Sequence, residues 1–228
     1  MAEPFIAIST VSHGSMRNRK DPLDADVIAH REAWLKNLGI NISQTTRVNI
    51  SFVNNDDYCR YRHVGELEMG QGMYDDDVLP ADALITTTPG HTLFLPVADC
   101  VATTIYDEEN NVLMLTHLGR QSLEQQGGFK SIEHLQNHYG SDPKKLKIWL
   151  SPTVNKAAYP IFKLDNMGMK EALYEQFKEA GVPLDTIIDN KEDTATNPQY
   201  YSYSEFLKGN KPEDGSHAMV ATLPGGVQ

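Results

Sequence analysis

The sequence has few cysteines and no long apolar run. Only two cysteines, Cys59 and Cys100, occur among 228 residues, which excludes a disulfide scaffold and predicts two thiols in a reducing compartment. No run of about 18 apolar residues is present, so no membrane-spanning helix is expected. The N-terminal segment MAEPFIAISTVSHGS lacks the cationic start and continuous apolar stretch of a signal peptide. We therefore predict a cytoplasmic protein that is neither exported nor inserted in a membrane.

Positive charge is also scarce. The chain has 20 Lys and Arg against 31 Asp and Glu, a formal net charge of −11. Nucleic acids and anionic membranes recruit proteins through clustered basic side chains, so neither is expected as a partner. A local basic pocket is compatible with this balance, and a small molecule is the expected partner. The sequence does not determine the oligomeric state.

The chain shows no internal repeat and no low-complexity linker, so residues 1–228 are expected to form a single domain. Neither GxGxxG after a strand nor GxxxxGKS occurs, which argues against a dinucleotide fold and a P-loop enzyme. The acidic run at 75–77 lacks the spaced ligands of a calcium loop and is expected to be a solvated loop.

Apolar patterning predicts a mixture of strands and helices. Helical spacing of apolar residues, and glycines after two of the segments, predict helices at 24–38, 130–140 and 169–181. Short apolar or alternating runs predict strands at 4–11, 47–53, 81–87, 91–100, 100–107, 111–117 and 147–152. DEENN, at 107–111, is typical of a hairpin turn. The mixture favours an α/β or α+β sandwich in which helices flank a mixed sheet.

Cys100 and His117 come at the ends of two neighbouring predicted strands. Two such strands would hold both side chains at one rim of the sheet, with Asp99 beside them. Gly119 would permit a tight turn, and Arg120 would supply a cation. Three interpretations stay open from the residues alone: buried packing residues, a thiol catalyst with its base, or two ligands of a metal.

The stretch ADALITTTPGHTLFLPVADC, followed after a short hairpin by THLGR, resembles the YfiH/laccase-domain family, also called the multicopper polyphenol oxidase or purine nucleoside phosphorylase family. Its members carry approximately ADALVT, a glycine turn, TADC and then AHAGWRG. VIAHREAWLKNLGI, IWLSPTVNKAAYP and NPQYYSYSEF resemble further family segments in the same order. The resemblance therefore extends through most of the chain.

The resemblance implies a YfiH-like fold, similar to that of cytotoxic necrotizing factor toxins, and a zinc site built from two histidines and one cysteine. Cys100 matches the family ligand in ADC, and His117 matches the ligand in AHAG. Three protein ligands would leave the fourth zinc position for water or substrate. Copper is not expected, because a blue-copper site requires two histidines, a cysteine and an axial donor, a set that is not visible in this sequence.

Several positions depart from the family pattern. The family's first histidine lies in a QVHG element that is missing here, so Cys59 is the expected third ligand and His63 the alternative. Arg120 occupies the position of the family's tryptophan and is expected to bind a phosphate or carboxylate. His217 replaces a local Gly-Arg pattern. These departures predict a divergent branch with its own substrate.

The resulting hypothesis is a metal-dependent enzyme, with zinc, acting on a purine nucleoside or similar small polar molecule by phosphorolysis or hydrolysis. Cys100, His117 and Asp99 would form the catalytic centre, and Arg120, His13 and His217 would contact substrate. One alternative is a metal-free Cys/His hydrolase or deamidase in which an imidazolium stabilises a thiolate. Another is a noncatalytic binding protein that kept the pocket and lost the chemistry.

Overall fold

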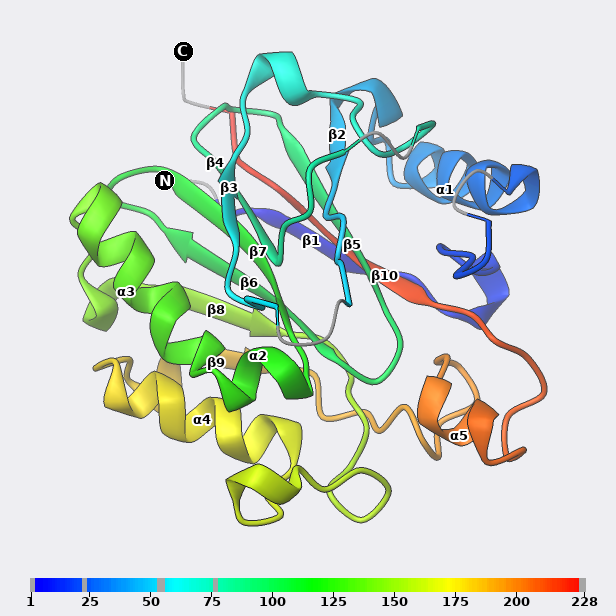
Figure 1. The fold of residues 1–228 in the computed structure, drawn as a ribbon. Helices are drawn as coiled ribbons and strands as arrows, with labels where there is room; N and C mark the ends of the chain where they lie inside the picture. Colours follow the sequence, from blue (N-terminus) through cyan, green and yellow to red (C-terminus); the bar gives the residue numbers. More distant parts are fainter. Residues whose placement is uncertain (1–2, 22–23, 53–55, 76–77, 226–228) are drawn as a thin grey trace.

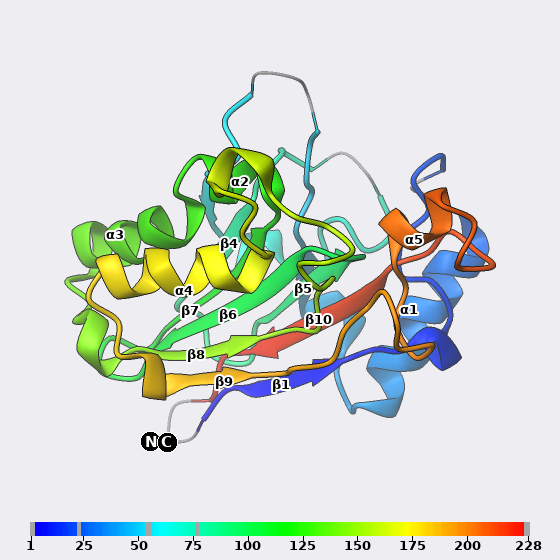
Figure 2. The ribbon, with the colours of Figure 1, turned by 90° about the horizontal axis from the view of Figure 1, so that it is seen from below.

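A computed structural model describes residues 3–21, 24–52, 56–75 and 78–225. In this part of the chain, two β-sheets pack face to face, and helices cover the outer face of each sheet (Figures 1 and 2). The succession of layers is α1, a four-stranded sheet, a six-stranded sheet, and then α2, α3 and α4. This arrangement confirms the predicted α/β sandwich, with two mixed sheets where one was expected.

The four-stranded sheet joins the first and last strands of the chain. Its order is β1-β10-β5-β2, in which β10 is antiparallel to both neighbours and β2 is parallel to β5. The strands are β1 (Phe5–Ile8), β2 (Thr45–Arg47), β5 (Thr92–Val97) and β10 (His217–Thr222).

The six-stranded sheet carries the central hairpin. Its order is β3-β4-β7-β6-β8-β9, with β6 and β7 in antiparallel register. Asp107 closes the predicted turn, because its Oδ1 accepts the amides of Glu109 (3.0 Å) and Asn110 (3.1 Å). The strands are β3 (Tyr61–His63), β4 (Ala83–Thr86), β6 (Val101–Asp107), β7 (Val112–Leu118), β8 (Lys147–Leu150) and β9 (Ile187–Asp189).

Amphipathic helices close the two outer faces. Asp24 caps α1, and Trp34 of that helix packs on Phe94 of the four-stranded sheet. The opposite side of the molecule is covered by α3 and α4, whose Leu135 and Leu173 are completely buried. The helices are α1 (Ala25–Asn37), α2 (Arg120–Glu124), α3 (Gly127–Tyr139), α4 (Met169–Glu179) and α5 (Tyr203–Leu207). Short 3-10 turns occur at Val11–His13, Ile42–Gln44, Glu66–Glu68, Pro143–Lys145, Phe162–Leu164 and Leu184–Thr186. Within the described ranges, no helix has both the length and the apolar character needed to cross a membrane.

The segment at 47–53 is the clearest departure from the predicted elements. β2 ends at Arg47, and residues 48–52 form no strand, although Val48 and Ile50 are buried in the core between the two sheets. The alternation of apolar and polar residues at 47–53 therefore reflects the burial of Val48 and Ile50. It does not reflect pairing of residues 48–52 as a strand. Asp76 and Asp77 of the acidic run, and residue 53, lie outside the described residues.

Candidate functional site

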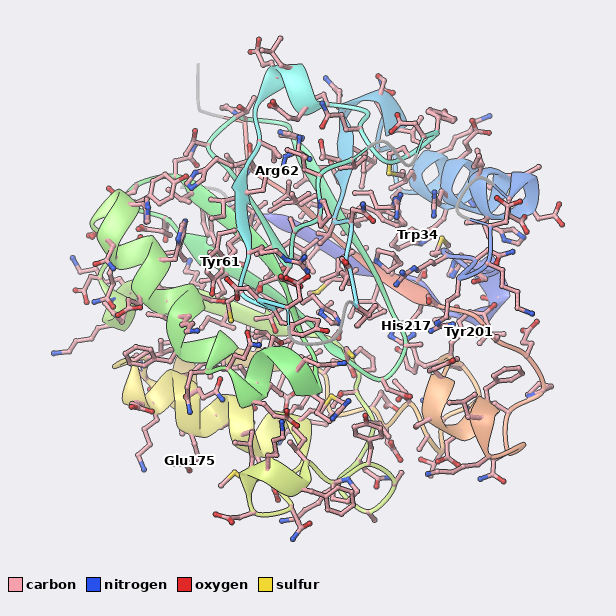
Figure 3. The ribbon with its side chains drawn as sticks, viewed as in Figure 1. Trp34, Tyr61, Arg62, Glu175, Tyr201 and His217 are labelled. Atoms are coloured by element: carbon pink, nitrogen blue, oxygen red, sulfur yellow. The ribbon has the colours of Figure 1, made fainter. Side chains whose placement is uncertain are left out.

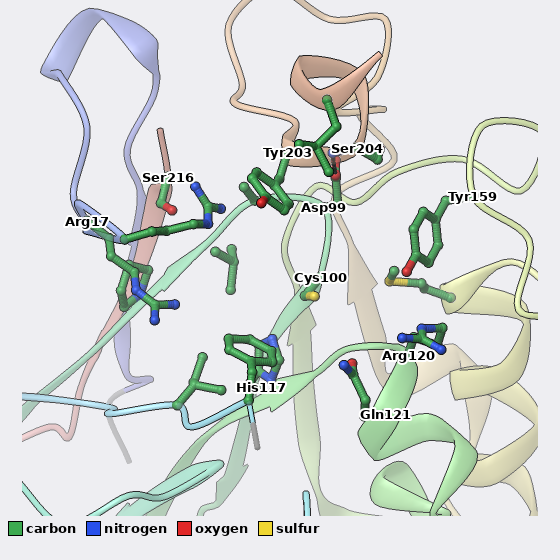
Figure 4. Close-up of a pocket in the computed structure, with 18 of the residues that line it drawn as sticks. Arg17, Asp99, Cys100, His117, Arg120, Gln121, Tyr159, Tyr203, Ser204 and Ser216 are labelled. Atoms are coloured by element: carbon green, nitrogen blue, oxygen red, sulfur yellow. Dashed lines mark hydrogen bonds between the residues drawn. The ribbon is translucent and has the colours of Figure 1, made fainter. Parts of the chain in front are cut away.

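A pocket of about 700 Å³ opens where β5, β6 and β7 reach one edge of the sandwich. The N-terminal loop, the segment after β2, the start of α2 and the α5 region form its walls (Figure 4). Cys100 and His117 lie close together in its centre. The structure thus brings together four of the residues predicted from sequence: Asp99, Cys100, His117 and Arg120.

The register of β6 and β7 explains why the two central side chains meet. Val101 pairs with Leu118 and Ala102 pairs with His117. Residues that face each other in an antiparallel pair share a face, as do residues two apart on one strand. Cys100, one residue before this ladder, consequently lies opposite Gly119 and on the same face as His117.

Gly119 provides the space that both side chains need. A Cβ atom at this position would lie 2.7 Å from Cys100 Sγ and 3.0 Å from His117 Cε1. The backbone there has φ −102° and ψ −177°, an ordinary extended conformation. The glycine is therefore required by close approach rather than by its backbone angles.

His117 is buried and electrically neutral at physiological pH. Its side chain is packed edge-to-face against Phe52, with ring centroids 5.9 Å apart and an interplanar angle of 87°. Burial, together with the nearby charge of Arg17, lowers the pKa of the imidazole to about 3. A neutral imidazole has one nitrogen that donates and one that accepts a hydrogen bond.

Cys100 is a thiol rather than a thiolate. Its side chain is partly buried, and this burial, reinforced by the negative charge of Asp99, raises the pKa of the thiol to about 12. Arg17, Arg19 and Arg120 oppose the shift without reversing it. The ion pair of thiolate and imidazolium that a cysteine hydrolase requires is therefore not the resting state of this pocket.

Asp99 supports the pocket wall. Its backbone is left-handed, with φ 79°, and its buried carboxylate accepts hydrogen bonds from Thr194 Oγ1 and from the Ser204 amide, both at 2.7 Å. Its carbonyl oxygen accepts from the hydroxyl of Thr153. Asp99 thus ties the loop before β6 to the segment after β8, to Thr194 and to the start of α5. Both of its carboxylate oxygens have protein partners.

Basic side chains surround Cys100 and His117. Among the described residues that line the pocket, the cations are Arg17, Arg19, Arg120 and Lys208, and the only acidic side chain is Asp99. In Figure 4, Arg17 and Arg120 stand on opposite sides of the Cys100/His117 pair. In a chain with a net charge of −11, this cluster makes the pocket the expected place for an anion.

Arg120 is the cation with the clearest unmet hydrogen-bonding capacity. It begins α2, and its Nη1 lies 3.6 Å from Glu124 Oε1, a loose contact. Its Nε is buried without a hydrogen-bond partner in the described structure. A buried donor without a partner costs free energy, which an anionic ligand would recover. By contrast, Arg19 is paired with Asp214, and Lys208 Nζ lies 2.7 Å from Glu205 Oε1.

The structure places the other predicted site residues away from the pocket lining. Cys59 is buried beside Gln125, whose carbonyl oxygen lies 3.9 Å from its Sγ, and burial raises the pKa of the Cys59 thiol to about 11. His63 belongs to a surface group with His134, their Nε2 atoms being 3.2 Å apart. His13 Nδ1 accepts the Thr10 amide at 3.0 Å.

His217 lies at the start of β10 (Figure 3) and is completely buried. It is packed edge-on against Tyr200, with a centroid distance of 5.2 Å. Neither of its ring nitrogens has a hydrogen-bond partner in the described structure, and burial lowers the pKa of the imidazole to about 3. Its neighbour Ser216, not His217, lines the pocket.

The donor set does not fit the three-ligand zinc site implied by the resemblance. Zinc in proteins is held by at least three side-chain donors such as Cys, His, Asp or Glu. Over the described residues, no group of three such side chains is arranged to hold a metal ion. Cys100 and His117 supply two donors, Asp99 is committed to hydrogen bonds, and Cys59 lies outside the pocket lining.

Comparison with known proteins identifies the family. Residues 15–164 match the family model described as multi-copper polyphenol oxidoreductase laccase. The chain belongs to this family. This laccase-domain chain is also 25% identical over 113 residues to a purine nucleoside phosphorylase of Bacteroides thetaiotaomicron, a match that covers 50% of the chain and 39% of that relative.

Solved structures share the fold of this laccase-domain chain. YlmD from Geobacillus stearothermophilus superposes with a TM-score of 0.81 at 18% identity, covering 98% of this chain and 93% of that one. The hypothetical protein YfiH of Bacillus licheniformis gives a TM-score of 0.75 at 18% identity, with coverage of 86% and 80%. At this identity the likeness establishes the fold alone.

Sequence reasoning missed several lining residues. Arg17 and Arg19 lie in a loop that precedes the first helix by several residues, and Phe52 lies in a segment predicted as a strand. Lys208 follows α5, at the far end of the chain. The two arginines in SMRNRK are the one available signal, because they are basic residues in a chain of net charge −11 and follow shortly after the first predicted strand.

Proposed function

We propose that this chain is an enzyme that cleaves the N-glycosidic bond of a purine nucleoside with inorganic phosphate, using the pocket around Cys100 and His117. The observation that carries the proposal is the basic lining of this pocket, and above all the buried Nε of Arg120 that has no partner in the described structure. The name of the Bacteroides relative supports the same class of reaction.

Phosphate is the ligand that the basic side chains suit best. A planar guanidinium donates two parallel hydrogen bonds to a phosphate, and Arg120 stands beside Cys100 and His117 with donors available for such a contact. Arg17 and Lys208 add positive charge on other walls. Together they lower the free energy of a doubly charged oxyanion in a pocket closed on several sides.

Aromatic side chains give the pocket a second character. Phe52, Tyr159 and Tyr203 line it, and flat heterocyclic bases stack favourably on such rings. The lining therefore offers both the charge for phosphate and the apolar area for a purine. Asp99 fixes the wall that carries Tyr203, through its bond to the amide of Ser204.

His117 assists the departure of the base. In the reaction, a phosphate oxygen forms a bond to C1′ of the sugar while the bond between C1′ and the purine nitrogen breaks, and the proton of the phosphate passes to the purine. A neutral imidazole donates a hydrogen bond to the purine as negative charge develops on it. The products are the free base and a sugar 1-phosphate. Zinc has no part in this proposal, because the donor set does not fit it.

The test is an assay of base release from inosine, guanosine and adenosine with and without inorganic phosphate. We expect phosphate-dependent formation of the free base and of ribose 1-phosphate, and a fall in kcat of about 100-fold or more in His117→Ala. Arg120→Gln should raise the KM for phosphate about 10-fold or more, with a smaller effect on the KM for the nucleoside.

Lys163→Gln is the matched control for Arg120→Gln. Lys163 contacts the same partner, Glu124, at 3.1 Å, but its side chain is 75% exposed and does not line the pocket. Its replacement should leave both KM values unchanged. Base release at the same rate without phosphate would show that the enzyme is a hydrolase and not a phosphorylase. If folded protein releases no base from any purine nucleoside, the proposal is rejected.

A further inference from the structure

We propose that the Cys100/His117 pocket works without a metal ion because the ring of Phe52 occupies the space of the third metal donor. The inference concerns the composition of the pocket and stands apart from the reaction proposed above. It rests on three observations: the segment after β2 lines the pocket, the ring of Phe52 contacts that of His117, and the other candidate metal donors have protein partners elsewhere.

The segment after β2 brings apolar side chains into the pocket. It leaves the four-stranded sheet at Arg47, and both Ile50 and Phe52 then line the cavity. The segment begins the region upstream of ADALIT in which the resemblance implies a third ligand, and in which Cys59 was the expected one. Cys59 does not line the pocket, whereas Phe52, an aromatic ring without a donor atom, stands on its wall.

The position of Phe52 matches the space of a ligand. Two imidazoles bound to one tetrahedral zinc, with bonds of about 2.0–2.1 Å, have ring centres about 5 Å apart. The rings of Phe52 and His117 have centroids 5.9 Å apart and lie nearly perpendicular. Cys100 Sγ and His117 Cε1 lie 2.7 and 3.0 Å from the Cβ position of Gly119, so the sulfur and the imidazole are neighbours. Phe52 thus stands against His117 at nearly the spacing of a second imidazole that shares an ion with it.

The other candidate donors are engaged elsewhere. Both carboxylate oxygens of Asp99 accept hydrogen bonds at 2.7 Å, from Thr194 and Ser204. Cys59 directs its sulfur toward the carbonyl of Gln125 and does not line the pocket. Across the described ranges, no three side chains of His, Cys, Asp or Glu are grouped to hold an ion.

Guanidinium groups supply the positive charge in the same space. The guanidinium of Arg17 lies 5.8 Å from the centre of the Phe52 ring, in the arrangement of a cation–π contact. Arg120 approaches from the opposite wall (Figure 4). The Phe52 ring therefore also holds the guanidinium of Arg17 in the pocket. The fixed positive charge of this guanidinium can polarise a bound ligand in place of a metal ion.

The experiment measures the metal content of untagged protein purified from cells grown with added zinc. The wild-type chain is expected to contain less than about 0.1 zinc per chain, whereas Phe52→His is expected to contain about one, because it completes a Cys/His/His set. In cobalt-exchanged Phe52→His, a cobalt–thiolate charge-transfer absorption should appear. It should disappear when Cys100→Ser is added.

Phe5→His is the matched control. Phe5 and Phe52 are exposed to a similar extent, 47% and 49%, and Phe5 lies on β1 outside the pocket lining. Its replacement should leave the metal content at the wild-type value. A wild-type chain with about one zinc that is lost in His117→Ala would overturn the proposal. A folded Phe52→His protein that binds neither zinc nor cobalt would overturn the placement of Phe52 at the third donor position.

Discussion

Gly119 lies directly opposite Cys100 across the β6–β7 pair, and a methyl group at residue 119 would lie 2.7 Å from the sulfur. Gly119→Ala should therefore displace Cys100 or His117 and lower the free energy of unfolding by about 1–3 kcal/mol, the usual cost of overpacking. The catalytic activity proposed for the pocket should fall with it. Urea unfolding and the nucleoside assay measure the two effects.

Gly225→Ala is the control for this substitution, because nothing lies within 4 Å of a Cβ placed at that glycine. It should change neither quantity. A Gly119→Ala protein that is as stable and as active as the wild type would show that the sulfur and the imidazole have room to move apart.

Asp99 holds two segments that are distant in sequence. Asp99→Ala removes an acceptor for Thr194 and for the Ser204 amide and places alanine at φ 79°, so a loss of about 3 kcal/mol in unfolding free energy is expected. Asp99→Gly loses the same hydrogen bonds but relieves the backbone, and should cost about 1 kcal/mol less.

Hydrogen exchange distinguishes this anchoring role from general destabilisation. In both variants, the amides of α5 should exchange faster than those of α3, which is on the far side of the six-stranded sheet. Equal changes in α3 and α5 would contradict the anchoring role.

Buried histidines make the fold sensitive to acid, and His217 is the clearest case. Burial lowers its pKa to about 3 in the folded protein from an ordinary value of 6.5, so the unfolded chain binds a proton between these values and the folded chain does not. Stability contributed by the neutral imidazole is therefore present above pH 6.5 and is lost as the pH falls. At pH 5 this one group should cost about 2 kcal/mol.

His217→Leu removes that proton uptake and two buried nitrogens without partners in the described structure. The variant should be more stable than the wild type at pH 5, by an amount that shrinks toward pH 7, when both are unfolded in urea. Parallel pH profiles for wild type and His217→Leu would contradict the burial of a neutral imidazole.

Cys100 is expected to be a slow nucleophile because the pKa of its thiol is raised. Because the Cys100 thiol has a pKa of about 12, little of it is thiolate at pH 7. Iodoacetamide should therefore alkylate Cys100 at least about 100-fold more slowly than an unfolded cysteine at pH 7, and the rate should rise steadily to pH 10. The measurement uses Cys59→Ser protein, so that mass spectrometry follows a single thiol. Rapid alkylation near pH 6 would favour the metal-free thiol catalyst instead.

The elements with strong local patterning were predicted from the sequence, and the residues that approach the pocket from loops were not. The continuous apolar runs of β4 to β8 and the amphipathic spacing of α3 and α4 reflect the face that each element buries, so their positions could be predicted. The division into two sheets depends on which strands pair, and this is a long-range property. β5 precedes β6 directly in the chain but pairs with β10 and β2.

The candidate site shows the same limit. Cys100 and His117 could be predicted because one hairpin holds them, whereas Arg17, Phe52 and Lys208 reach the pocket along separate segments with no shared spacing. Cys59 was expected at the pocket from its place in the sequence. Its backbone instead follows the hydrogen bond to Asp57 and the packing beside Gln125.

The left-handed residue Asp99 has a consequence for how such a pocket changes over evolution. The base of the pocket belongs to a rigid hairpin, but Tyr203 and Lys208 are carried by a separate stretch of chain that one carboxylate attaches to it. Substitutions and length changes in that stretch can therefore reshape the entrance while the hairpin stays intact.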